Sequence, residues 1–588
     1  MRSTQIILSG SLVCLFFGLP AIAQTTSNIE GTVKDPQGAV VAGAQVKASS
    51  PALATERTTT SDTDGFYRIT ALPAGTYTLS ASQTGFGSRN FESLELTLNR
   101  TLILDIQLEV EALQGDVRIT AATQLIDPTT SSTGATVTPQ QIQDLPVNGR
   151  DYLDLLQLVP GVAINRQVDP DSDEATPVLG ERGGNNNFFI DGHPNKDTVN
   201  GGPAAQFNQE TIAEFQVLTT GYKAEFGQAS GGVINVITKS GGNDFHGVGS
   251  LFHRNETFDK SNSLDETRTD APYLRRFDYS VALGGPIIKD RVFFFGSAER
   301  ITENRRLNFN FPVTGNAVTD RLLRNQEEPF DNPNQSRETR IFFKLNEQLG
   351  RHQLTQEVNY TNGLVRDFLP LSAGQSLPSS RSDSGARHLL LAFGDTMLLG
   401  EQSNPWIVTL RGAYRGEPSD TRPSHPEAGV GTRFNPFTRP GFLFGDLPQI
   451  FFGNSLTAYN VNQKYTSFTA NANKRFGDHD VKFGWNFLRT KVDALNPRVL
   501  NSQVFSSVED FAEFGPIFGG ISLLAAIGGV TPEDDEIHLR NNYNGLFVQD
   551  DWKLLRNLTV NLGLRWEHDS EFEAKRNFAP RLGVAWAV

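Results

Sequence analysis

The chain has 588 residues and a formal net charge of −14, which argues against nucleic acid as its main partner, because phosphate binding needs a basic surface. Only 38% of its residues are apolar, which excludes a helical membrane protein and gives no sign of wholesale disorder. Glycine (54) and phenylalanine (41) are abundant whereas methionine (2) and cysteine (1) are scarce, as is typical of all-β proteins with many turns.

The N-terminus predicts a secretory signal peptide over residues 1–23. Arg2 supplies a positive charge, residues 6–19 an apolar run, and Ala21-Ile22-Ala23 the small residues of a cleavage site. The only cysteine, Cys14, lies within the run, and the better cleavage site follows it, which disfavours a lipoprotein. The mature chain is therefore expected to have no disulfide and no cysteine metal site. No later stretch reaches the ~20 apolar residues of a transmembrane helix, so a periplasmic, secreted or outer-membrane barrel protein is expected.

Residues 24–110 predict a β-sandwich, because short strands alternate with turn signals every ~8–12 residues. Asp35-Pro36-Gln37-Gly38 and Asp62-Thr63-Asp64-Gly65 are two of the turns. Strands are expected near residues 29–33, 44–48, 66–70, 77–82 and 101–108. The phrases GTVKDPQGAVVAGAQVKA and DTDGFYRITALPAGTYTLSA resemble the carboxypeptidase regulatory-like domain, which implies a prealbumin-like fold. No His-x-x-Glu zinc set accompanies them, so no peptidase activity is expected.

Residues 122–241 predict a small α+β unit. Thr138 and Pro139 are a good N-cap and first-turn residue for a short helix, and a second short helix ends at Pro160-Gly161. Strands are expected at residues 188–190, 211–217 and 231–238, the first running into the Asp191-Gly192 turn.

The remainder, residues 242–588, alternates apolar and polar residues with period 2 in many segments. Leu562 and Leu564 alternate with Asn561 and Arg565, for example, and segments of ~10 such residues are what membrane barrel strands require. A soluble sandwich also alternates, with its apolar side turned inward. Strands are expected near residues 244–254, 276–284, 291–301, 337–346, 352–360, 387–398, 405–415, 464–476, 479–490, 542–552, 557–567 and 580–588.

The links between these strands favour the membrane barrel over the sandwich. Short links, such as Gly477-Asp478, alternate with long polar links, such as residues 416–463. Long loops at one end and tight turns at the other are the pattern of bacterial outer-membrane barrels. The predicted fold class is therefore mainly β: signal peptide, prealbumin-like β-sandwich, small α+β unit and antiparallel transmembrane β-barrel.

Several phrases are similar to plug and barrel segments of TonB-dependent receptors: LPVNGRDYLDLLQLVPGV, RGGNNNFFIDGHPN, ETIAEFQVLTTGYKAEFGQASGGVINVITKSGGNDFHG and NFAPRLGVAW. With the N-terminal sandwich, the domain order resembles the Oar-like branch of this family. The resemblance implies a plug at 122–241, an outer-membrane location, a periplasmic N-terminal domain and TonB as partner. It also implies a larger barrel with a terminal aromatic residue, whereas about twelve strands are visible here and the chain ends at Ala587-Val588. A fragment, or a continuation encoded elsewhere, is expected.

The resemblance further implies a segment before the plug that couples to TonB by adding a strand to it. Residues 111–121 occupy this place, and Asp116, Val117, Arg118, Ile119, Thr120 and Ala121 have the alternation of an extended strand. An ordinary linker, or the first strand of the plug, is the alternative explanation.

No catalytic, cofactor or metal site is predicted, and the protein is not expected to be an enzyme. Asp169-Pro170-Asp171-Ser172-Asp173 has the spacing of a calcium loop, but Glu174 replaces the required glycine and a solvated loop explains it better. Asp62 and Asp64 fit a turn, and the acidic run Glu533–Glu536 fits a solvated loop. The nine histidines are scattered, and no strand–glycine loop–helix unit surrounds the plug glycines.

Six arginines are candidates for inward-facing charges that hold the plug by pairing with its carboxylates; an ordinary polar lumen is the alternative. They are Arg150, Arg182, Arg340, Arg411, Arg475 and Arg565.

The predicted function is active uptake of a nutrient across the outer membrane, energised by TonB, with outer-membrane lipid and an unknown extracellular ligand as the other partners. A carbohydrate or peptide is a reasonable substrate because the sandwich resembles carbohydrate-binding folds, and a siderophore is less so. A surface binding or adhesion protein without transport and a secreted multi-domain β protein remain as alternatives.

Overall fold

The computed structural model describes residues 27–110, 117–120, 129–164, 176–259, 273–306, 317–368, 381–425, 459–495, 536–571 and 576–587. Within these ranges, the structure does not describe residues 52, 54, 99, 146, 148–149, 402–403 and 556. Outside them, it describes Pro378 and four short strands in the long loops. None of the helices within these residues is both long enough and apolar enough to cross a membrane.

The N-terminal unit is a sandwich of two sheets, as predicted. One sheet has the order β4-β1-β7, with β8 also paired to β1, and the other has the order β3-β2-β5-β6-β9. Its core is formed by inward residues of both sheets, among them Ile29, Tyr67 and Leu79. The strands are β1 (Ser27–Lys34), β2 (Gln45–Ser49), β3 (Arg57–Thr60), β4 (Phe66–Leu72), β5 (Gly75–Ser82), β6 (Arg89–Leu96), β7 (Thr101–Ile103), β8 (Ile106–Gln107) and β9 (Val117–Thr120).

Two sandwich strands, β3 and β6, were not predicted. β3 has the sequence Arg-Thr-Thr-Thr, which contains no apolar residue to show an alternation. β6 loses its alternation at Ser93, whose backbone has φ +60° where the pairing register with β5 shifts.

The plug unit is a five-stranded sheet of order β10-β13-β14-β11-β12 with short helices beside it. Thr138 caps α1 in a capping box with Gln141, which confirms the predicted helix start. The second predicted helix is a 3-10 helix capped by Asp151. The elements are β10 (Thr133–Val137), α1 (Pro139–Asp144), η4 (Tyr152–Leu158), η5 (Gly183–Asn185), β11 (Asn187–Ile190), β12 (His193–Pro194), η6 (Gln209–Thr211), β13 (Ile212–Thr220) and β14 (Val233–Thr238).

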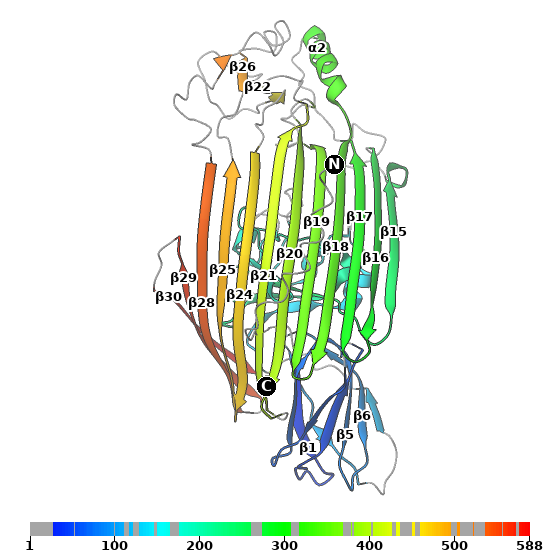
Figure 1. Cartoon of the computed structure of the whole chain (residues 1–588), viewed down its shortest axis with the longest axis vertical. Helices are drawn as coiled ribbons and strands as arrows, with labels where there is room; N and C mark the ends of the chain where they lie inside the picture. Colours follow the sequence, from blue (N-terminus) through cyan, green and yellow to red (C-terminus); the bar gives the residue numbers. More distant parts are fainter. Residues whose placement is uncertain are drawn as a thin grey trace.

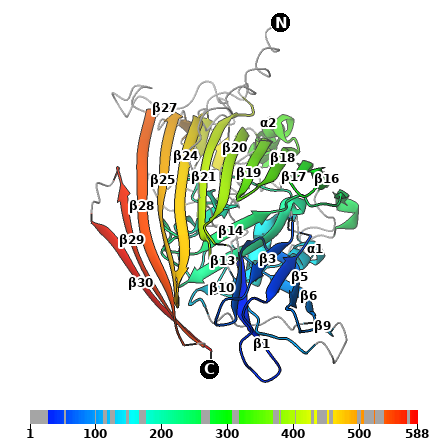
Figure 2. The ribbon, with the colours of Figure 1, turned by 60° about the horizontal axis from the view of Figure 1, so that its bottom comes forward.

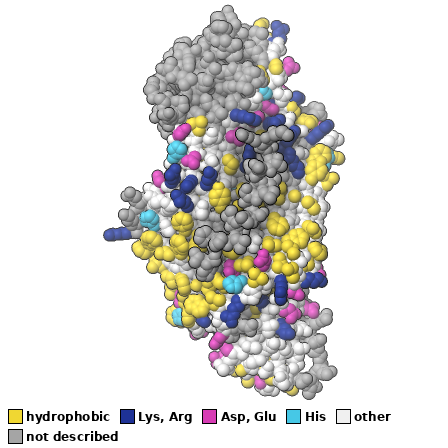
Figure 3. Space-filling view, in the orientation of Figure 1, with side chains coloured by type: hydrophobic (Ala, Val, Ile, Leu, Met, Phe, Trp, Pro, Cys, Tyr) yellow, Lys and Arg dark blue, Asp and Glu magenta, His cyan; other side chains and the backbone are white. Residues whose placement is uncertain are grey.

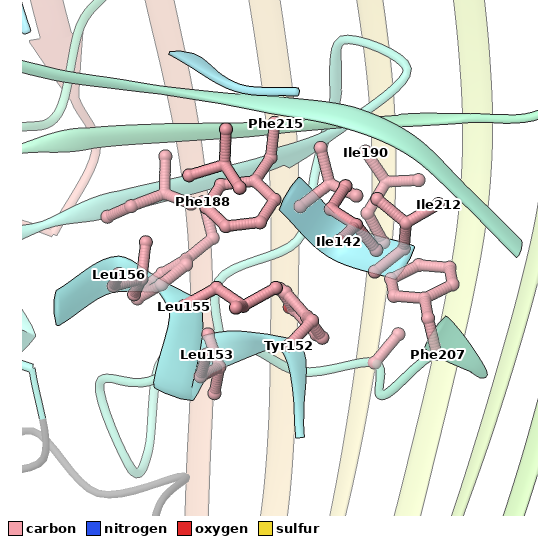
Figure 4. Close-up of a cluster of buried hydrophobic side chains, with 14 of the residues drawn as sticks. Ile142, Tyr152, Leu153, Leu155, Leu156, Phe188, Ile190, Phe207, Ile212 and Phe215 are labelled. Carbon is pink, nitrogen blue, oxygen red and sulfur yellow. The ribbon is translucent and has the colours of Figure 1, made fainter. Parts of the chain in front are cut away.

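The core of the plug unit lies between its sheet and η4 (Figure 4). The Tyr152 ring meets the rings of Phe207 and Phe215 edge-on, with centroids 6.2 Å apart in both pairs. Phe207 in turn contacts Phe342 of the barrel sheet. The apolar core therefore continues from the plug into the barrel wall.

The barrel unit is one sheet of twelve antiparallel strands in which each strand pairs with its neighbours in sequence, from β15 to β30. The sheet curves around the plug, and the sandwich lies at the end with the short turns (Figures 1 and 2). All twelve predicted strands are present. They are β15 (His246–Asn255), β16 (Leu274–Ile288), β17 (Val292–Arg305), β18 (Asn334–Leu349), β19 (His352–Phe368), β20 (Ser382–Leu399), β21 (Trp406–Pro423), β24 (Tyr459–Phe476), β25 (His479–Leu495), β28 (Glu536–Leu555), β29 (Leu558–Asp569) and β30 (Asn577–Trp586).

The predicted alternation is confirmed by exposure. Leu562 and Leu564 on the outer face of β29 are each 42% exposed, whereas Arg565 between Leu564 and Trp566 is 1% exposed. Hydrophobic side chains gather on the outer wall of the barrel sheet, with Lys and Arg more frequent above and below them (Figure 3). This is the outward apolar band that a lipid-facing barrel requires.

The barrel strands extend further than predicted at the end with the long loops, where their sequences are polar and carry no apolar alternation. The long loops contain α2 (Ala317–Glu327), η7 (Glu256–Phe258), η8 (Glu328–Phe330) and a small sheet of order β23-β22-β26-β27. The strands of this sheet are β22 (Gly431–Phe434), β23 (Ile450–Phe452), β26 (Ser502–Phe505) and β27 (Ile521–Ser522).

Candidate functional site

The contact between plug and barrel is the candidate functional site, and its centre is the tight turn between β11 and β12. Asp191 and Gly192 form the turn, with φ of +45° and +79°, the combination that favours an Asp-Gly pair in a two-residue hairpin. The Arg411 guanidinium of the barrel lies where a Cβ on Gly192 would be, so glycine is required there. Burial and nearby Arg411 lower the pKa of His193, the next residue, to about 3, so its imidazole is neutral.

The turn directs Asp191 at a buried lysine of the barrel wall. Lys344 on β18 lies 3.1 Å from the Asp191 carboxylate and 3.5 Å from that of Glu357 on β19. It also donates to the Thr238 hydroxyl of the plug at 3.0 Å. Burial alone would raise the pKa of Asp191, but Lys344 and the Thr238 hydroxyl outweigh it and lower the pKa. The lysine therefore bridges a plug carboxylate and a barrel carboxylate in a space closed to water.

Arg565 on β29 holds a second part of the plug. Its guanidinium donates to the carbonyls of Ala224 and Glu225 at 3.1 and 3.3 Å. Barrel groups complete its shell: the Glu567 carboxylate at 2.7 Å and the Tyr543 hydroxyl at 2.6 Å. A planar guanidinium satisfied on several sides suits a buried clamp of this kind.

Two further ion pairs cross the same boundary in opposite directions. Lys223 of the plug lies 2.6 Å from Asp551 of β28. Glu225 of the plug pairs with Lys482 of β25. The positive side chain comes from the plug in one pair and from the barrel in the other. The plug and the barrel therefore each contribute one positive and one negative side chain to this contact.

Toward the end with the long loops, barrel residues bind the end of β12 and the plug loop that follows it. Arg415 donates to the carbonyls of Pro194 and Lys196 at 2.9 and 2.5 Å, and its guanidinium lies 3.8 Å from the ring centre of Tyr465. The Tyr465 hydroxyl bonds Thr198 in turn. The plug is thus held along its height by polar contacts.

The six arginine candidates divide into two groups. Arg340, Arg411 and Arg565 face the plug, but Arg340 and Arg565 bind plug carbonyls rather than carboxylates, which corrects the prediction. Backbone carbonyls are reached because the plug loops run close to the barrel wall. The others do not join plug to barrel by ion pairs: Arg150 pairs within the plug with Glu210, Arg182 is exposed, and Arg475 faces the sandwich.

The lysine–carboxylate pairs were not predicted. In the sequence, Lys344 and Lys482 are polar residues on one side of alternating strands, a pattern that they share with many other residues of the barrel and that does not identify their partners. Among the described residues, no group of three or more His, Cys, Asp or Glu could hold a metal ion. The calcium-like run at 169–173 lies outside the described residues, as does most of the acidic run at 533–536.

Of the predicted coupling segment, Val117–Thr120 is described and forms β9, whereas Asp116 and Ala121 lie outside the described residues. β9 pairs in parallel with β6, from Arg89↔Val117 to Glu92↔Thr120. The segment is therefore extended, as predicted, and it is the edge strand of a sandwich sheet.

The sandwich also contacts the plug through a buried carboxyl group. The Leu98 amide donates to Glu214 of β13 at 2.7 Å, and Glu214 is 2% exposed. Burial raises the pKa of Glu214 to about 7, although the Leu98 amide acts in the other direction.

We expect this group to make the plug less stable as the pH rises. The pKa of Glu214 is raised from 4.5 to about 7 in the folded state. Its contribution to the stability of the plug is therefore fully present below about pH 4.5 and is lost as the pH rises through about 7. The loss is at most on the order of 3 kcal/mol. The measurement is the free energy of opening of the β13 amides by hydrogen exchange between pH 5 and 8, corrected for intrinsic rates. The Glu214→Gln variant should flatten the profile, and an equal slope in both proteins would contradict the assignment.

Comparison with known proteins agrees with this arrangement. Residues 28–109 match the carboxypeptidase regulatory-like domain, residues 127–233 the TonB-dependent receptor plug domain, and residues 237–320 and 330–577 an outer membrane beta barrel domain. The TonB-dependent transporter Oar of Myxococcus xanthus is 24% identical over 663 aligned residues, covering 100% of this chain and 61% of that protein.

Solved structures share the fold at low identity. The outer membrane transporter YddB of Escherichia coli has a TM-score of 0.55 at 13% identity, covering 77% of this chain and 58% of that one. The siderophore receptor PirA of Acinetobacter baumannii has a TM-score of 0.52 at 15% identity, covering 77% and 59%. The chain thus spans about three-fifths of the length of these relatives.

The barrel match alone covers more than half of the chain, the three matches follow one another as sandwich, plug and barrel, and the match to Oar extends over the whole chain. The outward apolar band of the barrel places it in the outer membrane, with the N-terminal sandwich on the periplasmic side. The chain therefore belongs to the TonB-dependent receptors of the bacterial outer membrane, in the branch that carries an N-terminal carboxypeptidase regulatory-like domain.

Proposed function

We propose that this protein takes up a nutrient across the outer membrane, with energy supplied by TonB through residues 116–121. The observation that carries the proposal is a plug that lies inside the barrel sheet and is bound to it by ion pairs and hydrogen bonds, such as Lys344–Asp191 and Lys482–Glu225. Polar contacts can be exchanged for water as they break, so a pull can rearrange such a plug without a large apolar surface being exposed.

The substrate proposed is a carbohydrate or a peptide. The N-terminal domain matches the carboxypeptidase regulatory-like domain. The support is the analogy between such domains and carbohydrate-binding folds. By name, PirA is a siderophore receptor and PfeA of Pseudomonas aeruginosa is a ferric enterobactin receptor, but at 14–15% identity their likeness concerns the fold.

The test removes a backbone amide that strand addition to TonB would use. Proline at position 119 removes an amide that a partner strand would bind, whereas alanine keeps it. In cells producing the full-length protein, a panel of radiolabelled oligosaccharides and peptides is screened for uptake that a protonophore abolishes. We expect Ile119→Pro to reduce this uptake at least about tenfold while Ile119→Ala has little effect.

Binding of the same labelled compounds to chilled cells is the control, and it should be equal in both variants. Unchanged uptake in Ile119→Pro and in a deletion of residues 111–121 would refute TonB-driven transport. Binding without any protonophore-sensitive uptake in the parent protein would point instead to a surface binding protein.

A further inference from the structure

A chamber of about 570 Å³ lies where the sandwich, the plug and the barrel meet. Each unit contributes to its wall: Glu95 and Thr97 from the sandwich, Thr136 and Gln216 from the plug, and Asn471 and Gln549 from the barrel. Most of the residues that line the chamber are polar or charged, and it lies between the plug and the periplasmic domain.

The plug contacts described above border the chamber. Lys223 and Glu225 of the plug line it together with their barrel partners Asp551 and Lys482. A rearrangement that separated these pairs would therefore release this part of the plug from the barrel wall beside the chamber. The sandwich would then lie between the chamber and the periplasm.

The sandwich is docked on the barrel by a buried group of charges. Glu30 and Arg68 are paired across β1 and β4, and they are 3% and 5% exposed. The Arg68 guanidinium lies 2.5 Å from the Asp480 carboxylate of β25 and 3.4 Å from Glu30. Glu30 also pairs with Lys553 of β28. Charges from both units thus alternate in one network.

The periphery of this contact is polar as well. Arg475 of β24 lies 4.0 Å from Glu30, and its guanidinium is 4.0 Å from the ring centre of Phe66. Arg57 of the sandwich donates to Gln348 of the barrel at 3.2 Å. Burial would raise the pKa of Glu30, but Lys553, Arg68 and Arg475 outweigh it and lower the pKa, so the carboxylate is charged while docked.

The apolar cores do not cross this contact. Among the described residues, one hydrophobic cluster consists of sandwich residues from Ile29 to Leu108, another combines plug and barrel residues, and a third lies within the plug. Undocking therefore exposes charged groups that water can solvate and leaves each core intact. Polar contacts between units with separate cores are the ones that open and close most readily.

The coupling segment is attached to the sandwich rather than to the plug. β9 is the edge strand of the sheet β3-β2-β5-β6-β9 and pairs with β6. A pull on this segment would act on the sandwich before it reaches β10, the first strand of the plug.

We propose that the N-terminal sandwich is a periplasmic gate, held shut by the network of Glu30, Arg68, Asp480 and Lys553, and that it must undock before cargo leaves the chamber. The inference rests on the proposed uptake function, because a gate is needed only if cargo passes through the barrel. What it says about the structure is that the docked sandwich restricts access to the chamber, and this access is measured without any substrate.

The test measures access to the chamber. The only cysteine of the chain, Cys14, lies in the expected signal peptide, so Thr136→Cys introduces a single thiol into the wall. Purified full-length protein, without TonB, is treated with a charged methanethiosulfonate reagent and the rate of modification is measured. We expect slow modification when Thr136→Cys is the only change, and a rate at least about tenfold higher when Arg68→Met or Asp480→Asn is added to it.

Two controls separate gating from damage. Lys34→Met removes a surface ion pair with Asp105 within the sandwich, 3.7 Å long, and should leave the rate unchanged. Asp480→Asn alters only the barrel side, so a raised rate in this variant cannot come from a misfolded sandwich. Unchanged rates in both Arg68→Met and Asp480→Asn would overturn the gate.

A second experiment joins the gate to transport. The paired changes Arg57→Cys and Gln348→Cys are bridged by a reducible bismaleimide, which locks the sandwich to the barrel. We expect protonophore-sensitive uptake of the labelled compounds to be lost and then restored by reduction. Full uptake in the bridged protein would refute the gate while leaving TonB-driven transport in place. Slow labelling of the thiol introduced at position 136, rising in the network variants, would support the gate even if no transport were found.

Discussion

Replacing Lys344 by methionine is expected to destabilise the plug by about 3–5 kcal/mol. Lys344 is 5% exposed and lies between the carboxylates of Asp191 and Glu357, which are 6% and 3% exposed. Methionine fills a similar volume but leaves the two carboxyl groups without the positive charge that lies between them. The cost is that of uncompensated buried charges, which exceeds the stabilisation that an intact buried pair provides.

The measurement is the free energy of opening of amides in β11 and β14, the plug strands beside Asp191, by native-state hydrogen exchange. A second change, Asp191→Asn, should recover part of the loss in the Lys344→Met background, because it removes one of the stranded charges. Lys474→Met is the matched control, since Lys474 contacts the Asn404 carbonyl near a periplasmic turn, and a change below about 1 kcal/mol is expected. Equal losses in Lys344→Met and Lys474→Met would contradict the bridging role.

Replacing Arg565 by methionine is expected to release the plug segment around Ala224, at a cost on the order of 3–5 kcal/mol. The guanidinium is 1% exposed and bonds two plug carbonyls, the Glu567 carboxylate and the Tyr543 hydroxyl. Its loss leaves Glu567 without its cation and the carbonyls without donors, and each buried group left unsatisfied costs about 1–3 kcal/mol.

Limited proteolysis of the plug, together with hydrogen exchange of residues 221–227, reports this release. Arg300→Met is the matched control, because Arg300 lies on an exposed position of β17 and donates to Thr339 alone among the described contacts. We expect the control to leave the cleavage rate unchanged. Protection of residues 221–227 equal to that of the parent in Arg565→Met would show that the plug is held there by other contacts.

The sequence predicted local features well because their causes are local. The capping box of Thr138 and Gln141 lies within four residues, and the Asp191-Gly192 turn within two. The barrel strands were predicted because one side of each faces lipid and the other a polar interior, so residues such as Leu562 and Arg565 alternate along the chain. β3 and β6 of the sandwich were missed where polar composition or a bulge removes that pattern.

The sequence by itself therefore determined the order of the three units, the alternating strands of the barrel and the extended form of residues 117–120. Only the tertiary structure decided which inward side chains meet, because a strand places a polar residue inside without specifying its partner. Lys344 and Asp191 come from different units, and Glu30 and Lys553 are 523 positions apart in the chain. Such contacts depend on how plug, sandwich and barrel are packed together, and no periodicity along one strand encodes that packing.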